Sequence, residues 1–491
     1  MKKSFLYVLI LFILPTSCKK AIEVLPTSIL TSSTFWKTES DAIGALNGMY
    51  VNLRSDAAIN LFILGEARAQ TMSQALAGTV GLDIYYLNSL NVDNISVSWG
   101  GFYKTIDAAN LLLKYVPEIN ITMAGSKNNI LAQAYTMRAF CYFVMAKAWG
   151  GVPIRTEPTE GYDPLTIQKE RASVDDVFKL IKADLNQAIL LFPNNNFATG
   201  RNTWTKAGAN TLKADVFLWT AKLMNGGNAD LQTALTALND VQSADVGLLP
   251  VFADIFNYNN KGNREVIMSS RFQVNESANN YYEYMYVNAS NNPSNVSQAT
   301  KDYVGVIGSG NAGNSIMQVA APVRALFTVD DTRKGAAFYE IRSTTNAYIA
   351  SIAGTKGNGT VVSGIRHFKN DVMIYRYADV LLMKAEAKNA LGQDPSPEIN
   401  LVRTRAYGAA NMGIRTYVND TKDTNDAAIL QERLLELVTE GKRWDDVRRF
   451  DKVNNLVPSM AGAPAFKLLF PIGTSVISLE PKVTENPGWK L

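Results

Sequence analysis

One helical stretch, residues 130–154, constrains the fold of this chain more than any other; it reads ILAQAYTMRAFCYFVMAKAWGGVPI. Its apolar side chains recur at steps of three and four residues, which is the spacing of one face of an α-helix. They are Ile130, Ala134, Met137, Cys141, Val144, Met145 and Ala148. No Gly or Pro interrupts the pattern before Gly150 and Gly151, and Pro153 then ends it. The stretch therefore predicts a long helix buried in the core, with Arg138 bonded at the core edge.

Charge and rare residue types exclude several classes of function. The 491 residues are 47% hydrophobic and 19% charged, with a formal net charge of +4, which is ordinary for a globular protein. No basic stripe is present, so we expect no binding to nucleic acid. The chain has one histidine, His367, and two cysteines, Cys18 and Cys141. A zinc cluster or a histidine-based triad would need more, so we predict no metal, no cofactor and no disulfide framework.

The N-terminus has the pattern of a signal peptide. Two lysines precede an apolar run over residues 5–14, which is too short to span a bilayer. Ser17 stands before a lone cysteine, Cys18, and this pair resembles the lipobox of bacterial lipoproteins, in which the cysteine sulfur takes a diacylglycerol. The pattern predicts a signal peptide over residues 1–17, lipidation of Cys18 and a tether over residues 18–33. Ordinary secretion without a lipid is the alternative.

Further amphipathic segments predict a mainly helical fold. Thr38 with Asp41, and Ser173 with Asp176, have the spacing of residues that cap the first turn of a helix. The segments expected as helices cover approximately residues 38–53, 99–115, 173–191, 205–224, 230–242, 373–391, 397–407 and 424–441. Because short turns with Gly or Asn would join them as antiparallel pairs, we expect stacked helix pairs in a tetratricopeptide-like superhelix.

The composition changes between residues 248 and 372. Asn, Ser, Gly and Tyr become dense there, and long helical periods vanish. We expect loops and short strands in this segment, which would form an irregular insert. The predicted organisation is a helical part over residues 34–247, the insert over residues 248–372, and a second helical part over residues 373–491.

Motifs in a fixed order run along almost the whole chain. They are WGGFYKTIDAANLLL at 99–113, RAFCYFVMAKAWGGVPI at 138–154, YRYADVLLMKAEAKNALG at 375–392, ERLLELVTEGKRWDDVRRF at 432–450, and NPGW at 486–489. Together they resemble the SusD/RagB family of cell-surface lipoproteins. The resemblance implies a right-handed superhelix, an outer-membrane location through a lipid anchor, and a SusC-like TonB-dependent transporter as partner. It also implies an oligosaccharide or peptide ligand and no catalysis.

Two glutamates, Glu436 and Glu440, are four residues apart, a spacing that could suit the paired carboxylates of a glycosidase. Arg433 precedes Glu436 by three residues, and Arg443 follows Glu440 by three, so each glutamate has a basic neighbour on a helix. Such neighbours would keep both carboxylates ionised, which does not suit a general acid. We therefore expect an ion-pair ladder on a helix surface, and no catalytic residue.

A glycine motif of the GxGxxG type occurs at Gly308, Gly310 and Gly313, with Asp330 some distance after it. This order of residues occurs in dinucleotide-binding folds, where it joins a strand to a helix. Such a fold would need several further strand–helix units, and the chain offers loop and helical sequence instead. We expect no nucleotide site here.

Two loops rich in aromatic and amide residues are the candidate ligand-binding sites. Sugar recognition needs aromatic faces for the C–H surfaces of a pyranose, beside amides and charges for its hydroxyls. The candidate residues are Tyr85, Tyr86, Tyr281, Tyr282, Tyr284, Tyr286 and Asn288. If residues 281–292 are extended, Tyr282, Tyr284 and Tyr286 share one face, which we expect to be exposed.

The predicted function is capture of an oligosaccharide, or of a peptide, and its delivery to the transporter at the cell surface. The alternative is a helical-repeat adaptor that binds only protein, in which these tyrosines pack the insert or touch the transporter. Exposed tyrosine rings would favour the glycan-binding hypothesis, and rings buried against helices would favour the adaptor.

Overall fold

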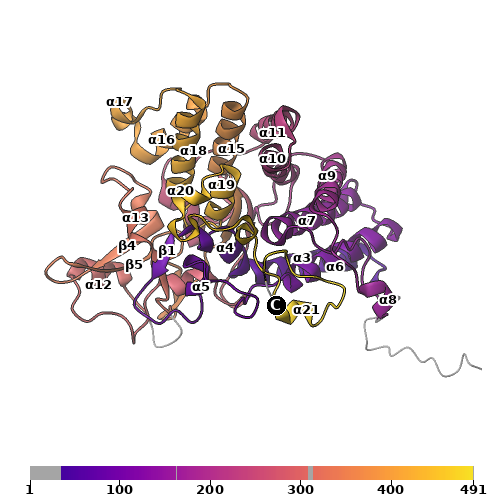
Figure 1. Cartoon of the computed structure of the whole chain (residues 1–491), viewed down its shortest axis with the longest axis horizontal. Coiled ribbons are helices and arrows are strands. Elements are labelled where there is room, and N and C mark those ends of the chain that lie inside the picture. The colour runs from indigo at the N-terminus through magenta and orange to yellow at the C-terminus, as the bar shows by residue number, and fades with distance from the viewer. Residues whose placement is uncertain (1–34, 162, 308–312, 490–491) are drawn as a thin grey trace, which may run out of the picture.

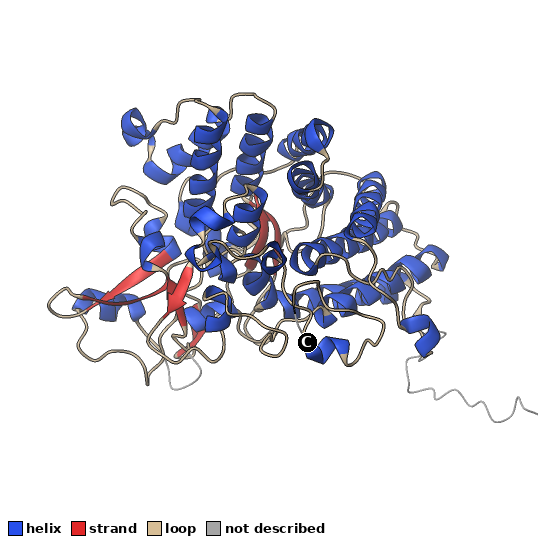
Figure 2. Cartoon of the chain, in the orientation of Figure 1, coloured by secondary structure: helices blue, strands red, loops and turns tan. Residues whose placement is uncertain are grey.

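The computed structural model describes residues 35–161, 163–307 and 313–489. The signal-peptide pattern, Cys18, Gly308 and Gly310 lie outside these residues, so the hypotheses on them stay predictions. Helices make up most of the molecule, and strands occupy only one end and the centre (Figure 2). The prediction of a mainly α fold is confirmed.

Ten helices of seven or more residues form the frame of the described chain (Figure 1). They are α3 (Glu39–Ala57), α6 (Gly100–Tyr115), α7 (Ser126–Trp149), α9 (Val174–Leu191), α10 (Lys206–Leu223), α11 (Gly227–Gln242), α15 (Tyr377–Ala390), α16 (Ser396–Tyr407), α18 (Lys422–Leu437) and α19 (Arg443–Arg449). From α3 to α15, each helix packs against the next one in this order, and α16 and α18 both pack against α15. A further helix, α12 (Gln298–Val304), lies apart from this frame in the insert. The expected stacking of helix pairs is therefore present.

Short elements connect this frame and build the insert. The short helices are α4 (Asn60–Gly65), α5 (Asp83–Tyr86), α8 (Pro164–Ile167), α13 (Ala321–Arg324), α14 (Lys334–Ala337), α17 (Met412–Arg415), α20 (Val453–Leu456) and α21 (Thr474–Ile477). The strands are β1 (Met72–Gln74), β2 (Val266–Ser270), β3 (Met317–Val319), β4 (Phe338–Arg342), β5 (Tyr348–Ala353), β6 (Thr360–Val362), β7 (Ile365–His367) and β8 (Val372–Arg376). They pair antiparallel as β1–β3, β2–β8, β4–β5 and β6–β7. Loops and short strands thus fill the segment where the sequence predicts them.

Side-chain caps fix the starts of two helices, as the sequence predicts. At α3 the Asp41 backbone N–H donates to Thr38 Oγ1 at 3.2 Å, and the Thr38 N–H donates to Asp41 Oδ2 at 2.7 Å. At α9 the Asp176 N–H donates to Ser173 Oγ at 3.1 Å. Each bond satisfies a backbone N–H that the helix itself leaves without a partner.

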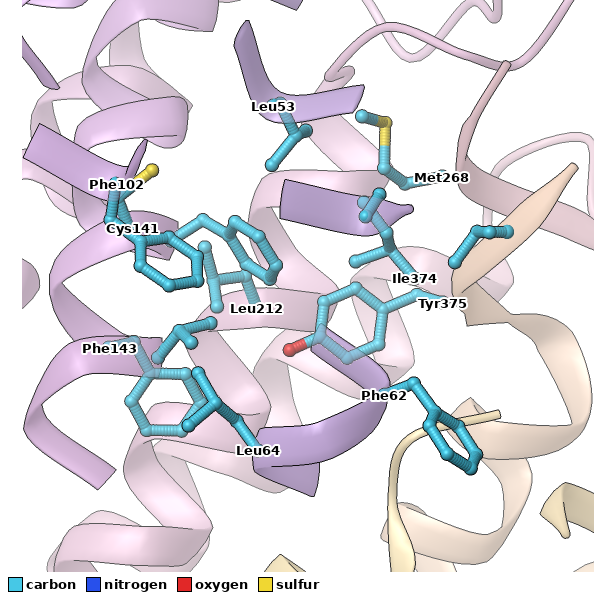
Figure 3. Packing of buried hydrophobic residues seen from close by; sticks show 14 of the residues in the cluster. Leu53, Phe62, Leu64, Phe102, Cys141, Phe143, Leu212, Met268, Ile374 and Tyr375 are labelled. Atoms are coloured by element: carbon cyan, nitrogen blue, oxygen red, sulfur yellow. The ribbon is translucent and has the colours of Figure 1, made fainter. Parts of the chain in front are cut away.

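Helix α7 lies at the centre of the helical core, and it ends at Gly150, whose φ of 77° is in the left-handed region. Its Cys141 and Phe143 pack near Phe102 of α6 and Leu212 of α10 (Figure 3). Arg138 is buried and not merely at the core edge: its guanidinium donates to both carboxylate oxygens of Asp184 at 2.8 Å.

Two predicted helix boundaries are wrong. Residues 373–376 belong to strand β8, and α15 begins only at Tyr377, because β8 pairs with β2 from a distant part of the sequence. Helix α18 ends at Leu437, four residues before the predicted end, because Thr439 adopts a φ of 68° that a helix cannot contain. Non-local pairing and a left-handed turn override local helical periodicity at these positions.

Asp56, at the end of α3, is a buried carboxyl whose proton affinity makes stability depend on pH. It is 2% exposed, and within the described residues only one of its oxygens has a hydrogen bond, from Asn60 Nδ2 at 2.9 Å. Burial raises the pKa of Asp56 to about 6. Because the folded-state pKa lies above the ordinary value of 3.8, the free energy of unfolding falls as pH rises from about 4 to about 6.

We therefore expect Asp56→Asn to raise the free energy of unfolding by about 2 kcal/mol at pH 7 and to have little effect near pH 4. Urea denaturation at the two pH values measures the difference, with Asp93→Asn as an exposed control. A gain of equal size at both pH values would contradict this explanation.

Candidate functional site

A groove of about 1070 Å³ brings together three segments that are distant in the sequence. They are residues 69–87, 320–326 and 427–458, which contribute β1, α5, α13, α18 and α20. These elements gather in the left half of the molecule in Figure 1. The volume is in the range of pockets that bind small ligands in proteins.

The lining of the groove is mainly apolar, with polar side chains among the apolar ones. Its apolar residues include Met72, Leu87, Val323, Leu326, Leu430 and Leu434. Its amide and hydroxyl residues are Gln70, Thr71, Ser73, Gln74, Thr79, Gln431 and Asn455. A few polar groups in an apolar lining are typical of sites that both bury and orient a ligand.

Local structure explains how these side chains reach one groove. Strand β1 pairs with β3 in the register Met72↔Val319. Helix α13 follows β3 directly in the sequence, so this pairing brings α13 beside β1. Leu430 and Leu434 are four residues apart on α18 and so share one face of that helix. Helix α5 adds Tyr86, whose ring is 5% exposed and whose hydroxyl has no hydrogen-bond partner within the described residues.

Of the predicted ligand-binding residues, Tyr86 is the one that lines this groove. Burial, and then the nearby Asp83 carboxylate, raise the pKa of Tyr86 to about 12, so its hydroxyl stays protonated and can donate. Tyr85 points elsewhere: it is fully buried, and its hydroxyl lies 2.7 Å from Ser96 Oγ. Asn288 Nδ2 donates to the Gly313 carbonyl at 2.8 Å, and its Oδ1 accepts two backbone N–H groups, so it holds a loop together.

The expected exposed aromatic surface at residues 281–292 is wrong. Residues Tyr281–Met285 form a 3₁₀-helix instead of an extended strand, so alternate tyrosines do not share a face. Tyr281, Tyr282 and Tyr286 are at most 3% exposed, and Tyr284 is half-buried. Within the described chain, the tyrosines of this segment therefore offer no open row of rings to a ligand.

The physical reason is that this segment packs against the helical frame. The Tyr281 ring stacks on Phe62 of α4 with centroids 4.5 Å apart, and its hydroxyl donates to the Thr439 carbonyl at 2.7 Å. The Tyr282 hydroxyl donates to the same Thr439 carbonyl at 3.4 Å. Both tyrosines join the insert to the rest of the fold.

Glu436 and Glu440 lie in a buried network and not in the predicted ladder on a helix surface. Arg376 of β8 donates to Glu436 at 2.6 Å, to Glu440 at 2.8 Å and to Glu265 at 3.0 Å. All four side chains are at most 2% exposed. Arg433 pairs with Asp379 and Asp446 instead, each at 2.8 Å.

This network suppresses acid chemistry at the two glutamates. Burial alone would raise the pKa of Glu436, but the guanidiniums of Arg405, Arg376 and Arg333 outweigh it and lower the pKa. At Glu440 burial also raises the pKa, and Arg376 with Lys356 lowers it below its ordinary value. Both carboxylates are therefore ionised at neutral pH and tightly paired, as the sequence predicts, which does not suit a general acid.

Asp330, the acidic residue after the glycine motif, belongs to a local ion pair. Both of its carboxylate oxygens accept from Arg415, at 2.6 and 2.9 Å. The sheets of the described residues are antiparallel pairs, without the parallel strands of a dinucleotide-binding fold. Gly313 is described, and its φ of 121° is one that glycine tolerates.

No group of three or more His, Cys, Asp or Glu residues with the geometry of a metal site occurs in the described chain. None of the described helices combines the length and the apolar composition that crossing a membrane requires.

The fold and the groove together define a mainly helical protein with an opening of ligand size. The family model described as "SusD family" matches residues 334–489, and the model described as "Starch-binding associating with outer membrane" matches residues 24–218. Among solved structures, B. fragilis NanU is 32% identical over 95% of this chain and 100% of its own, with a TM-score of 0.81. The chain belongs to the SusD family.

Two more relatives show how far the similarity extends. SusD-like protein P38 of Formosa agariphila is 28% identical over 502 residues, which cover 96% of this chain and 95% of that protein. Surface glycan-binding protein A from Bacteroides thetaiotaomicron is 19% identical over 92% of this chain and 100% of its own, with a TM-score of 0.73. The second similarity concerns the fold.

Proposed function

We propose that this protein captures an oligosaccharide, or a peptide, at the cell surface and delivers it to a SusC-like TonB-dependent transporter in the outer membrane. A lipid on Cys18 would anchor it there. The observation that carries the proposal is the groove, whose volume of about 1070 Å³ suits a ligand of several rings. The starch-binding description of one family model, and the glycan-binding name of a relative with the same fold, support it.

The groove offers the contacts that a sugar chain needs. Its leucine, methionine and valine side chains can cover the C–H surfaces of pyranose rings. Gln70, Gln74, Gln431 and Asn455 carry amides that both donate and accept, and therefore match hydroxyl groups. We propose binding without turnover, because the two paired glutamates are ionised and bonded on every side by arginine and lysine.

A substitution that fills the groove tests this proposal. Ala427 lines the groove on an exposed turn of α18, so Ala427→Trp adds a large ring there without disturbing the core. We expect at least about tenfold weaker binding of the variant to starch or laminarin oligosaccharides, because the bulky ring removes ligand contacts. Isothermal calorimetry on a panel of such oligosaccharides measures it.

Asp423→Trp is the matched control, because Asp423 is exposed on the same helix and does not line the groove. Its affinity and melting temperature should equal those of the wild type. Equal affinities for wild type and Ala427→Trp would show that the ligand binds outside the groove.

An adaptor that binds only protein remains the second candidate function. The burial of Tyr281, Tyr282 and Tyr286 favours it, because rings packed against helices offer no stacking surface. It predicts that the wild type binds the purified transporter and none of the oligosaccharides in the panel. The groove is the reason for preferring ligand capture, since a purely structural helical array needs no opening of this size.

A further inference from the structure

Tyr348, the first residue of β5, is the most exposed aromatic side chain of the described residues, at 38%. Every other described Phe, Tyr or Trp is more buried. Burial of an aromatic ring is strongly favourable, so a ring left open to solvent in this protein calls for an explanation. Tyr348 lies in the insert but outside the aromatic cluster that the sequence makes conspicuous.

The ring of Tyr348 is held in a fixed position. The guanidinium carbon of Arg324 lies 4.4 Å from the ring centroid and covers one of its faces. The hydroxyl donates to Gln318 Oε1 at 2.6 Å, which fixes the far edge of the ring. Arg342 is the partner of Tyr348 in the β4–β5 pair, at a shift of the register. An aromatic ring fixed on one face and at its edge is a preorganised surface.

The same contacts place this ring beside the groove. Gln318 of β3 receives the Tyr348 hydroxyl and the Ser351 N–H on its Oε1, and donates from Nε2 to the Gln74 carbonyl of β1 at 2.7 Å. Gln74 lines the groove, and so do Pro322 and Val323, the two residues before Arg324. The Gln318 side chain therefore links β1, the strand that lines the groove, to the exposed ring of Tyr348. In Figure 1, β1, β5 and α13 lie at the same end of the molecule.

We propose that Tyr348 is a stacking platform for a sugar ring of a ligand that extends out of the groove. The inference rests on the proposed capture of oligosaccharide, and it adds a second binding position to that site. The open face of Tyr348 would cover the C–H face of a pyranose. The guanidinium of Arg342 donates to Glu340 and to the Asn346 carbonyl, and, with its side chain 39% exposed, it would offer its remaining N–H groups to hydroxyl groups. Ligands longer than the groove would gain affinity from it, and short ones would not.

Three variants at this position separate the ring from its hydroxyl. Tyr348→Ala removes the ring, Tyr348→Phe keeps the ring without its bond to Gln318, and Tyr348→Trp keeps a stacking surface. Tyr258→Ala is the matched control, because Tyr258 is a half-buried tyrosine covered by Lys261 at 4.2 Å and it does not line the groove. The probes are starch and laminarin oligosaccharides, from disaccharides to long oligomers, titrated by calorimetry.

We expect Tyr348→Ala to weaken binding of long oligomers about tenfold and to leave disaccharide affinity unchanged. The Phe and Trp variants should stay within about twofold of the wild type, as should Tyr258→Ala. Unchanged binding of long oligomers by Tyr348→Ala, with Ala427→Trp still defective, would overturn the platform and leave the groove intact. Equal losses for short and long ligands with a lower melting temperature would show a structural role and overturn it too. A wild type that binds no oligosaccharide of the panel would overturn both the platform and the proposed capture of such glycans.

Discussion

Replacing Arg376 by alanine is expected to lower the free energy of unfolding by about 3–5 kcal/mol. Arg376 is the central cation of the buried network, in contact with Glu265, Glu436 and Glu440. Without it, carboxylates that cannot reach water lose a partner, and the cost of a buried unpaired charge exceeds that of a lost surface contact. Urea denaturation followed by circular dichroism measures the change.

Arg54→Ala is the control for this prediction. Arg54 forms an ion pair with Glu276 at 2.8 Å, but Glu276 is 53% exposed, so the pair is worth at most about 1 kcal/mol. If Arg376→Ala costs no more than Arg54→Ala, the buried network does not stabilise the fold.

The pH dependence of the free energy of unfolding provides a second test of Arg376→Ala. In the wild type the pKa of Glu436 is lowered. Its contribution to the free energy of unfolding is therefore present above the ordinary pKa of 4.5 and is lost as pH falls below that value. In Arg376→Ala the uncompensated carboxylates should take up protons more readily than in the unfolded chain. The variant should therefore gain more stability than the wild type on acidification from pH 7 to pH 5, because Asp56 contributes the same gain to both proteins.

Cys18→Ala is expected to abolish membrane association completely. Acyl chains on this cysteine would be the anchor, since each buried CH₂ contributes about 0.8 kcal/mol and alanine can carry no thioether-linked lipid. Membrane fractionation of cells that express the variant measures the loss, and mass spectrometry of the wild type detects the lipid.

Ser17→Ala is the matched control, because it keeps a small residue before the cysteine and should leave the protein in the membrane fraction. A Cys18→Ala variant that stays in the membrane, together with a wild type that carries no lipid, would contradict lipid anchoring.

Local signals predict the helices of this fold well, and non-local pairing explains the errors. The caps at Thr38 and Ser173, and the end of α7 at Gly150, depend on neighbours in sequence, so the residues themselves reveal them. Strand β8 exists because β2 lies beside it, and the local sequence continues smoothly into α15. Arginine partners for Glu436 were predicted, but from its own helix, whereas they come from β8, α14 and α16 or the residues next to them.

The candidate site was much less accessible from sequence. Composition identifies aromatic clusters, but it does not show whether their rings face solvent or the core. The sequence therefore places Tyr281 and Tyr282 at the surface, whereas they lie in the core. The groove is assembled from three distant segments, each of which is unremarkable alone. Tyr348 is a single tyrosine in a short strand, and the weak signal for it is the hairpin pattern that places it opposite Arg342.

The buried network has a consequence for how the chain reaches its folded state. Lys356 comes from the insert, Arg376 from β8, and Glu436 and Glu440 from α18 and the turn after it. Arg376 and Arg405 can pair with Glu436 and Glu440 within residues 372–440. Lys356 and Glu265 of the insert find their partners only when they reach this segment, so a partly assembled insert would hold unpaired charges in an apolar interior. We therefore expect the insert and the C-terminal helices to form in one cooperative step. The groove residues of β1 and α5 form no ion pair with this network, so exchanging them for a new ligand would leave it intact.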